Sequence, residues 1–427
     1  MTTPDRDPSP EKTGASTYAY YVLFALGLVN MLNYVDRHIL SILLQPVKQE
    51  FGVSDEWMGI LTGMAFVLVH SLFGIPIALL ADRTSRKAVI AMGVAIWSAL
   101  TALSGAAQAF WQLLVLRMGV GIGEAAGAPP SHAMISDYFE PARRATALSI
   151  YSMGVFAGIM FGYFAAGWIG EHFGWRLTFV AVGLPGLALA LLIHTTVREP
   201  PRADAGVEEP VREVFRYLFG KPAFAALMLA ASFHAVTSYA AVIWTPTLFL
   251  RLHGMSLSEI GVWLGLISGL GGAVGTLAGG TLADRLGRRD PRWYAWVAAL
   301  AAFAAVPCAF LYLRAESGTV ALAAYLPFIV LIGMYNGPLH AMNQWLAKPR
   351  MRAMSVAIQL LIVNIVGGGI GPWIVGRMND SLHAELGDAA IRTSMMLSLG
   401  TCAFFAGTLY LVTGVFLRRG IADTEEH

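Results

Sequence analysis

Four ionisable residues lie deep inside apolar stretches of the sequence, where a charge is costly. Asp36 and Arg37 are adjacent in one stretch, and Arg117 and Glu124 share another. An ionisable group in hydrocarbon costs at least about 2.5–3.5 kcal/mol, so these side chains should face a cavity and find partners. We therefore predict one polar cluster. A carboxylate that loses an arginine partner changes its affinity for a proton, which is the chemistry of proton coupling.

Helical spacing brings these residues onto common faces. Arg117 and Glu124 are seven residues apart, which places them on one side of a helix, and Asn33 and Arg37 are four apart with Asp36 on the flank. Glu124 is the first candidate for the proton-coupled acid and Asp36 the second. Arg37 could instead simply neutralise Asp36. The alternative for the whole cluster is a structural ion pair that fixes only packing.

Weaker polar signals lie elsewhere in the apolar stretches. Asn33 in the first half is a candidate for lining a cavity, as are several residues of the second half: Tyr239, Trp244, Tyr335, Asn336 and Asn343. The histidines in these stretches show no recognisable pair by spacing, and we expect hydrogen-bonded helix residues: His38, His70, His132, His194, His234 and His340. Two isolated cysteines exclude a disulfide framework, and we expect no metal site and no cofactor.

The composition identifies the solvent of this chain. Of its 427 residues, 56% are hydrophobic and only 13% are charged, with a mean hydropathy of +0.60. Soluble domains carry about 25% charged residues. Twelve stretches are long enough to span a bilayer: 18–44, 56–81, 88–109, 111–136, 144–170, 175–195, 222–250, 257–282, 293–313, 320–345, 352–378 and 392–416. The predicted fold class is an all-α polytopic membrane protein.

The distribution of positive charge predicts the topology. Of 29 Lys and Arg residues, 21 fall in the tails and even-numbered loops, 6 in or beside the odd-numbered loops, and Arg37 and Arg117 within spans. Cytoplasmic loops carry the excess of Lys and Arg, so both termini should be cytoplasmic. We expect a multi-pass protein of the plasma (inner) membrane.

The longest polar interval divides the spans six and six. Residues 198–221 form this linker, and its apolar positions predict a short amphipathic helix at the membrane surface. The expected organisation is a disordered tail at 1–17, six-helix bundles at 18–197 and 222–417, and a cytoplasmic tail at 418–427.

The loops that follow the second and eighth spans are related. Ala81–Lys87 reads ADRTSRK and Ala283–Arg289 reads ADRLGRR, 202 residues later. A repeat at about half the chain indicates duplication of a six-helix unit. Two such units predict two pseudo-symmetric bundles.

At these residues the chain resembles the major facilitator superfamily. The segment Gly280–Arg289 matches the signature loop of that family, whereas the first copy has Ala78 and Ser85 at its two glycine positions. The Arg117-x-x-x-Gly121-x-Gly123 pattern is similar to the second motif of the family. The resemblance covers residues 18–416 and implies the major facilitator fold and secondary transport by alternating access.

The same loops carry candidate gate residues: Asp82, Arg83, Asp284 and Arg285. An aspartate at a helix end can accept hydrogen bonds from arginine or from the N-terminus of a neighbouring helix. Such bonds would hold the halves together on the cytoplasmic side when the cavity faces outward. The alternative is a charge cluster that only sets topology.

Two branches of the family share the Asn33–Arg37 and Gly121–Ala125 patterns. Val197–Arg202, together with Trp244-x-Pro246 and Arg251, is similar to the spinster-like branch. That resemblance implies proton-linked movement of a sphingolipid or lysophospholipid. The other branch comprises symporters of organic anions such as hexuronates or aromatic acids. An uncoupled facilitator also stays open.

Other classes of protein fit the sequence poorly. The chain contains no G-x-x-x-x-G-K-[ST] phosphate loop, which argues against an ATP-driven pump. No nucleophile–base or metal spacing indicates an enzyme, and a receptor that binds without transporting is the remaining alternative. We expect a monomer whose partners are protons, membrane lipids and a small-molecule or lipid substrate, with no nucleic acid.

Overall fold

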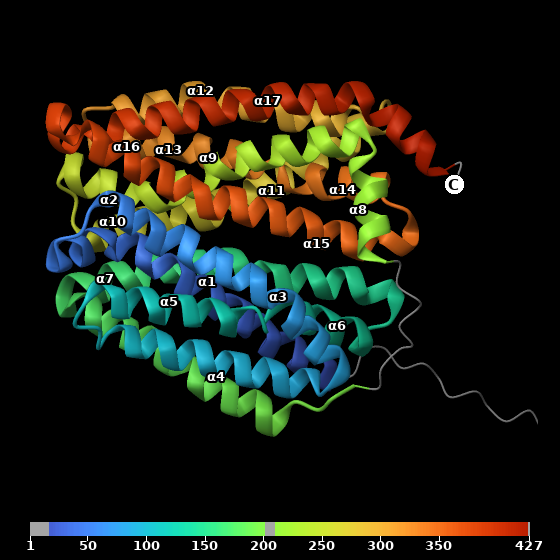
Figure 1. The fold of residues 1–427 in the computed structure, drawn as a ribbon, viewed down its shortest axis with the longest axis horizontal. Helices are drawn as coiled ribbons and strands as arrows, with labels where there is room; N and C mark the ends of the chain where they lie inside the picture. The colour runs from blue at the N-terminus through green and yellow to red at the C-terminus, as the bar shows by residue number, and fades with distance from the viewer. Residues whose placement is uncertain (1–16, 201–209, 426–427) are drawn as a thin grey trace, which may run out of the picture.

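The computed structural model describes residues 17–200 and 210–425 (Figure 1). Within these residues, nine helical runs are long and apolar enough to cross a membrane. Two of them, Pro141–Thr196 and Pro349–Thr424, turn back and cross twice, and 110–138 adds a crossing made of two shorter helices. The twelve predicted crossings are therefore present, and the all-α fold class is confirmed.

The first half of the chain folds into one bundle. Its elements are α1 (Thr17–Phe51), α2 (Asp55–Gly59), η1 (Ile60–Met64), α3 (Ala65–Arg83), α4 (Arg86–Ser104), α5 (Phe110–Glu124), α6 (Ala128–Tyr138) and α7 (Pro141–Thr196). Helices α1 and α4 pack on α7, and α5 lies between α3 and α4. The chain reverses within α7 at Gly174, whose φ of 80° and ψ of 165° are open essentially to glycine alone.

The second half repeats this arrangement. Its elements are α8 (Val211–Phe219), α9 (Pro222–His253), α10 (Leu257–Leu266), η2 (Ile267–Gly271), α11 (Gly272–Gly287), α12 (Trp293–Arg314), α13 (Gly318–Gly333), α14 (Asn336–Leu346), η3 (Pro349–Met351), α15 (Arg352–Val363), η4 (Asn364–Ile370), α16 (Gly371–Leu386), η5 (Gly387–Ala389) and α17 (Ala390–Glu425). Helices α9 and α12 pack on α17. Figure 1 shows the two bundles side by side, blue to green and yellow to red.

Two ends of the molecule can be told apart. The start of α1, helix α8 and the end of α17 share one end, which we call the terminus end (right in Figure 1). There the Tyr18 hydroxyl donates to the Thr196 carbonyl at 2.8 Å. The turns after α1, α9 and α16 lie at the opposite end, which we call the far end.

The last helix is longer than the sequence predicts. Helix α17 continues through the predicted tail at 418–427 as far as Glu425. Its end is held in place, because the buried Lys221 ammonium donates to the Gly420 carbonyl at 3.2 Å and Arg418 pairs with Asp290 at 2.9 Å. The predicted tail at 1–17 falls almost entirely outside the described residues.

Two crossings are broken near their midpoints. Helices α5 and α6 are separated by a turn at 125–127, and α13 and α14 by a turn at 334–335. Pro129 lies in the first turn of α6 and Pro338 in the first turn of α14, where a missing backbone N–H costs little. The break therefore recurs at equivalent places in both halves.

Candidate functional site

The four membrane-embedded charges form two crossed ion pairs between α1 and α5. Arg117 Nη1 donates to Asp36 Oδ2 at 2.8 Å, and Arg37 Nε donates to Glu124 Oε2 at 2.8 Å. Both guanidinium groups lie over the ring of Phe66, at 5.0 Å for Arg37 and 5.9 Å for Arg117. The structure therefore brings the four residues together around one aromatic side chain.

This pairing bears on an alternative that the sequence left open for Arg37. Arg37 does not neutralise its neighbour Asp36 but pairs with Glu124 instead. Successive residues of a helix point about 100° apart, so Asp36 and Arg37 reach different residues of the neighbouring helix. Each finds its partner on α5, where Arg117 and Glu124 are two turns apart on one face.

The two pairs differ in how far their side chains are exposed. The Arg117 and Asp36 side chains are 3% and 2% exposed, and the Thr101 hydroxyl also donates to Asp36 at 2.6 Å. The Arg37 side chain is 22% exposed, whereas that of Glu124 is fully buried. Arg37 is thus the member of the cluster that joins the buried carboxylate to open space.

Glu124 has an oxygen atom left over. Its Oε2 accepts from Arg37, while Oε1 is buried and has no hydrogen-bond partner among the described residues. A buried acceptor without a partner is costly, and protonation of the carboxyl group lowers that cost. The geometry therefore suits an acid that takes up a proton when its contact with Arg37 changes.

The predicted lining residues fall into two groups. Asn33 is 9% exposed, and Tyr239 and Asn336 are half-buried and hydrogen-bonded to Asn364 and Thr276. Three further candidates are buried by packing in this conformation, so their role in lining a cavity stays a prediction: Trp244 donates to the Pro372 carbonyl at 2.9 Å, Asn343 accepts from Ser355, and Tyr335 stacks on His234.

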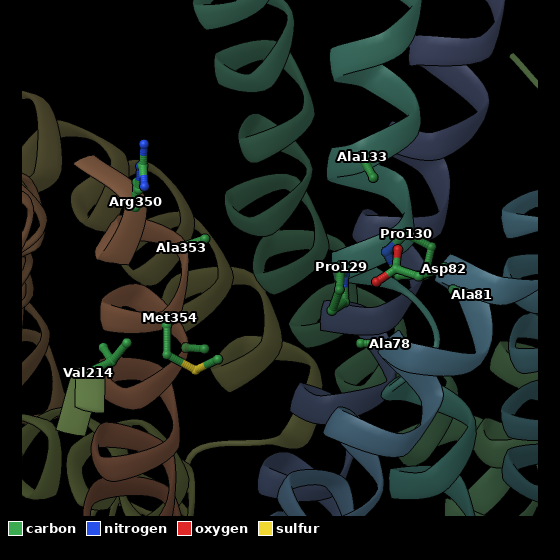
Figure 2. A pocket seen from close by; sticks show the side chains of 11 residues that line it. Ala78, Ala81, Asp82, Pro129, Pro130, Ala133, Val214, Arg350, Ala353 and Met354 are labelled. Carbon is green, nitrogen blue, oxygen red and sulfur yellow. The ribbon is translucent and has the colours of Figure 1, made fainter. Parts of the chain in front are cut away.

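A cavity of about 360 Å³ lies between the halves at the terminus end (Figure 2). Its walls are mainly small or apolar, with one acidic and one basic side chain: Ala78, Ala81, Asp82, Pro129, Pro130 and Ala133 from the first half, Val214 from α8, and Arg350, Ala353, Met354 and Ala357 from the second half. Neither membrane-embedded ion pair contributes to these walls.

The side-chain contacts that the described residues show for two of the predicted gate residues lie within one half each. Asp82 lies 3.9 Å from Arg86, and Asp284 accepts from the Tyr294 hydroxyl at 2.7 Å. Arg83 and Arg285 are exposed. Because a cavity separates the halves at this end, the bridge between them stays a prediction for another conformation.

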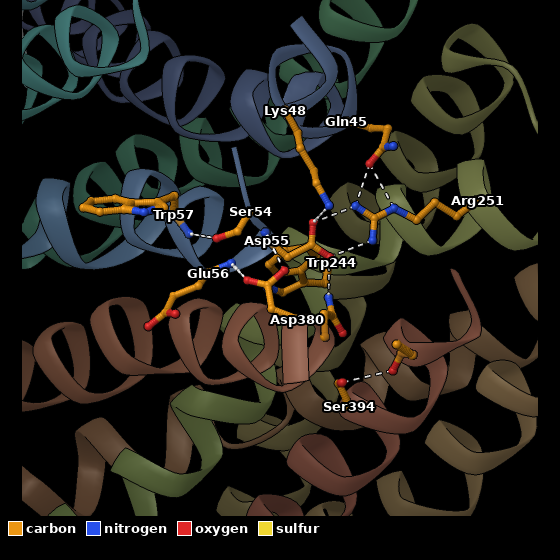
Figure 3. A network of polar contacts seen from close by, with 12 residues as sticks. Gln45, Lys48, Ser54, Asp55, Glu56, Trp57, Trp244, Arg251, Asp380 and Ser394 are labelled. Carbon is orange, nitrogen blue, oxygen red and sulfur yellow. Dashed lines mark hydrogen bonds and ion pairs between the residues drawn. The ribbon is translucent and has the colours of Figure 1, made fainter. Parts of the chain in front are cut away.

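The far end is held closed by a polar network that the sequence reading missed (Figure 3). The Asp55 carboxylate is buried and accepts from Lys48 at 2.6 Å and from both terminal nitrogens of Arg251 at 2.7 Å. Asp380 accepts from the backbone N–H groups of Asp55 and Glu56, at 3.0 and 2.7 Å, at the start of α2. The network therefore joins α1 and α2 to α9 and α16.

Backbone contacts reinforce this closure. A Cβ on Gly59 would lie 2.5 Å from the Pro372 carbonyl oxygen, and one on Gly63 would lie 2.5 Å from that of Gly368. Glycine permits this close approach of helices from the two halves. The molecule is thus closed at the far end and has its cavity at the terminus end.

A twelve-span bundle of two halves with a cavity between them and buried ion pairs defines a multi-pass membrane transporter, not an enzyme. The model of the Major Facilitator Superfamily matches residues 26–372. The chain therefore belongs to this superfamily, and its relatives place it in the spinster-like branch.

Curated relatives align over nearly the whole chain. An MFS-type efflux pump of Mycolicibacterium smegmatis is 33% identical over 408 residues, which cover 95% of each protein. Protein spinster homolog 1 of Homo sapiens is 27% identical over 450 residues, which cover 97% of this chain and 84% of that protein.

Solved structures of transporters share the fold of this chain. A bacterial homolog of the human lysosomal transporter Spinster, inward-facing and unoccupied, superposes with a TM-score of 0.82 at 30% identity, covering 97% of this chain and 99% of that one. A D-xylose–proton symporter shares the fold, with a TM-score of 0.71 at 17% identity over 96% of this chain and all of that one.

Proposed function

We propose that this transporter is proton-coupled and moves an amphipathic, lipid-like molecule of the sphingolipid or lysophospholipid type by alternating access. Its place is the plasma (inner) membrane, with both termini and the cavity on the cytoplasmic side. The observation that carries the coupling is the Glu124 carboxylate, with one oxygen on Arg37 and the other buried without a partner.

Proton coupling follows from a change in the ion pair between Arg37 and Glu124. While Glu124 is ionised, Arg37 is held to it at 2.8 Å. Protonation of Glu124 removes the opposite charge and releases the guanidinium of Arg37 from the carboxyl group. Asp36 and Arg117 keep their own pair throughout, so the second carboxylate acts mainly on structure.

The cavity walls support the cargo class. Alanine, proline and methionine side chains suit an alkyl chain, and Arg350 offers charge to a polar head. In the outward-facing state Asp82, Arg83, Asp284 and Arg285 would bridge the halves. An organic-anion symporter and an uncoupled facilitator are the outcomes that the following experiment separates.

The test is uptake of a labelled lysophospholipid or sphingosine-type amphiphile into liposomes, with and without an imposed pH gradient. The native chain, Glu124→Gln and the control Glu385→Gln, an exposed acid at the far end, are compared. We expect gradient-driven flux in the native chain and the control, and loss of the gradient dependence in Glu124→Gln.

Other outcomes have distinct meanings. If no amphiphile moves, the cargo class is wrong, and hexuronates and aromatic acids are tested next in the same liposomes. Flux that ignores the gradient in all three proteins identifies a facilitator and leaves Glu124 as a structural partner of Arg37.

A further inference from the structure

A second repeated motif follows the two helix breaks. Residues 130–134 read PSHAM and residues 338–342 read PLHAM, a separation of 208 residues. Each motif lies in the first half of a helix, α6 or α14, that begins just after a break in its crossing. His132 and His340 are therefore equivalent positions in the two halves, although their spacing in the sequence shows no pair.

The neighbours of these histidines are equivalent as well. The His132 ring lies 5.0 Å from that of Tyr151 on α7, and His340 Nδ1 lies 3.1 Å from Gln359 Nε2 on α15. Each neighbour is 19 residues further along the chain and is buried. The same tertiary contact thus occurs once in each half.

Both imidazoles are exposed. Helix α6 packs against α1, α3, α4 and α7, and α14 against α9, α11, α12, α15 and α17, all within their own bundles. The remaining side of α6 supplies Pro129, Pro130 and Ala133 to the cavity walls, and α15 beside α14 supplies Ala353, Met354 and Ala357 (Figure 2).

The contact with Gln359 sets the chemistry of His340. An amide nitrogen can only donate, so Gln359 Nε2 donates to Nδ1 of the neutral imidazole. The imidazole proton is then on Nε2 of an exposed side chain. His340 therefore presents a donor that suits an acceptor oxygen of a ligand.

We propose that His132 and His340 form a cargo subsite, one imidazole from each half, that donates hydrogen bonds to the anionic oxygens of a phosphate or carboxylate head. This inference rests on the proposed function and adds to it. The Glu124 cluster handles the proton, and the histidine pair holds the head group. Because each histidine belongs to a different half, a head held between them ties cargo binding to the relative position of the halves.

Chemical labelling tests the placement without requiring transport. With Cys308 and Cys402 replaced by serine, His132→Cys and His340→Cys are exposed to a membrane-impermeant thiol reagent from the terminus end. We expect 1-oleoyl-lysophosphatidylglycerol to slow labelling at both positions several-fold. His194→Cys is the control, because the last part of α7 lies on the side of the first bundle away from the second (Figure 1). Equal or absent protection at all three positions overturns the subsite.

Transport kinetics test the role. We expect His132→Leu and His340→Leu each to raise KM for lysophosphatidylglycerol about tenfold with kcat nearly unchanged, which corresponds to about 1.4 kcal/mol of lost binding. His340→Asn, which keeps a donor, should recover much of the loss. Oleate is a second probe, in which a carboxylate replaces the phosphate. Monoolein is uncharged, so its transport should have the same KM in the native chain and in the variants.

The failures of the two proposals are distinguishable. Gradient-driven lysophospholipid flux with an unchanged KM in both leucine variants overturns the subsite and leaves the proposed function standing. If the native chain transports oleate but not the lysophospholipid, and the leucine variants lose this transport, the subsite stands and the lysophospholipid class is overturned. If neither amphiphile moves or protects, both proposals are wrong.

Discussion

The two ion pairs between α1 and α5 place different demands on their residues. Asp36 and Arg117 are both buried, and Thr101 completes the hydrogen bonding of the carboxylate. Arg37 reaches open space, so its partner Glu124 can be released without stranding a buried cation. A pair that must never open and a pair that can open thus lie next to each other between the same two helices.

Asp36→Asn should destabilise the protein more than Glu124→Gln does. Removing the Asp36 charge leaves Arg117 buried without a counter-ion, which costs about 3–5 kcal/mol. Arg37 can instead turn toward the cavity when Glu124 is neutral. The measurement is the midpoint of thermal unfolding in detergent. Equal losses in the two variants would contradict the distinction, and an Asp36→Leu, Arg117→Met double variant should recover stability relative to Asp36→Asn.

Individual helices are shaped by a few special positions. Gly174 reverses the chain within α7, and no atom lies within 4 Å of a Cβ placed there. Its glycine requirement is therefore purely conformational. Gly59 and Gly63 are the opposite case, because backbone from the other half occupies the space that a side chain would need.

Gly174→Ala should cost about 1–3 kcal/mol of stability, because alanine is strained at that φ and ψ. Gly27→Ala is the matched control, since its Cβ also meets no atom within 4 Å but its backbone is helical. We expect the control to be neutral or slightly stabilising. Chemical denaturation of both variants decides the matter, and equal effects would mean that backbone strain is not the cause.

The turn between α11 and α12 should be insensitive to pH across the physiological range. A hydrogen bond from Arg292 lowers the pKa of Asp290 to about 2. A carboxyl group whose pKa is lowered by folding contributes stability above its unfolded value of about 3.9, and that contribution is lost as the pH falls toward 2. Asp290→Asn should therefore leave the shape of the pH profile of transport between pH 5 and 8 unchanged. A shifted profile would show that this turn takes part in coupling.

At the scale of the whole molecule, the ends of the two bundles are joined unequally. The far end carries the Asp55 network and the close glycine contacts, while the terminus end carries a cavity. Alternating access requires that the far-end contacts break when the terminus end closes. Asp55 is the centre of these contacts because it accepts from Lys48, Arg251 and Asn379.

Asp55→Asn should shift the population toward the state that is open at the far end. It removes the charge from hydrogen bonds worth about 1.5–3 kcal/mol each, and about 1.4 kcal/mol already changes the ratio of states tenfold. In a background lacking the two cysteines, a cysteine at the buried Thr247 should then react faster with a thiol reagent from the far side. Asp388→Asn, an exposed acid at the same end, is the control. Unchanged labelling would show that packing alone closes this end.

Much of the fold could be read from patterns along the chain. Apolar stretches predict spans because every backbone group in lipid must be satisfied within a helix. The membrane-embedded charges could be picked out for the same reason, since a charge there must have a partner. The break in span 4 was missed, although Pro129 and Pro130 carry a signal for it, because its apolar pattern continues without interruption.

By itself, then, the sequence determined the twelve crossings, the two related halves and the identity of the four buried charges. Tertiary structure alone decided that Asp36 pairs with Arg117 and Arg37 with Glu124, and that Asp55 and Arg251 meet across 196 residues of chain. It also decided that His132 lies against Tyr151 and His340 against Gln359. The physical reason is that periodicity says which side of a helix a residue occupies. Its partner depends on which helix packs there and at what height, and that is a property of the packed bundle.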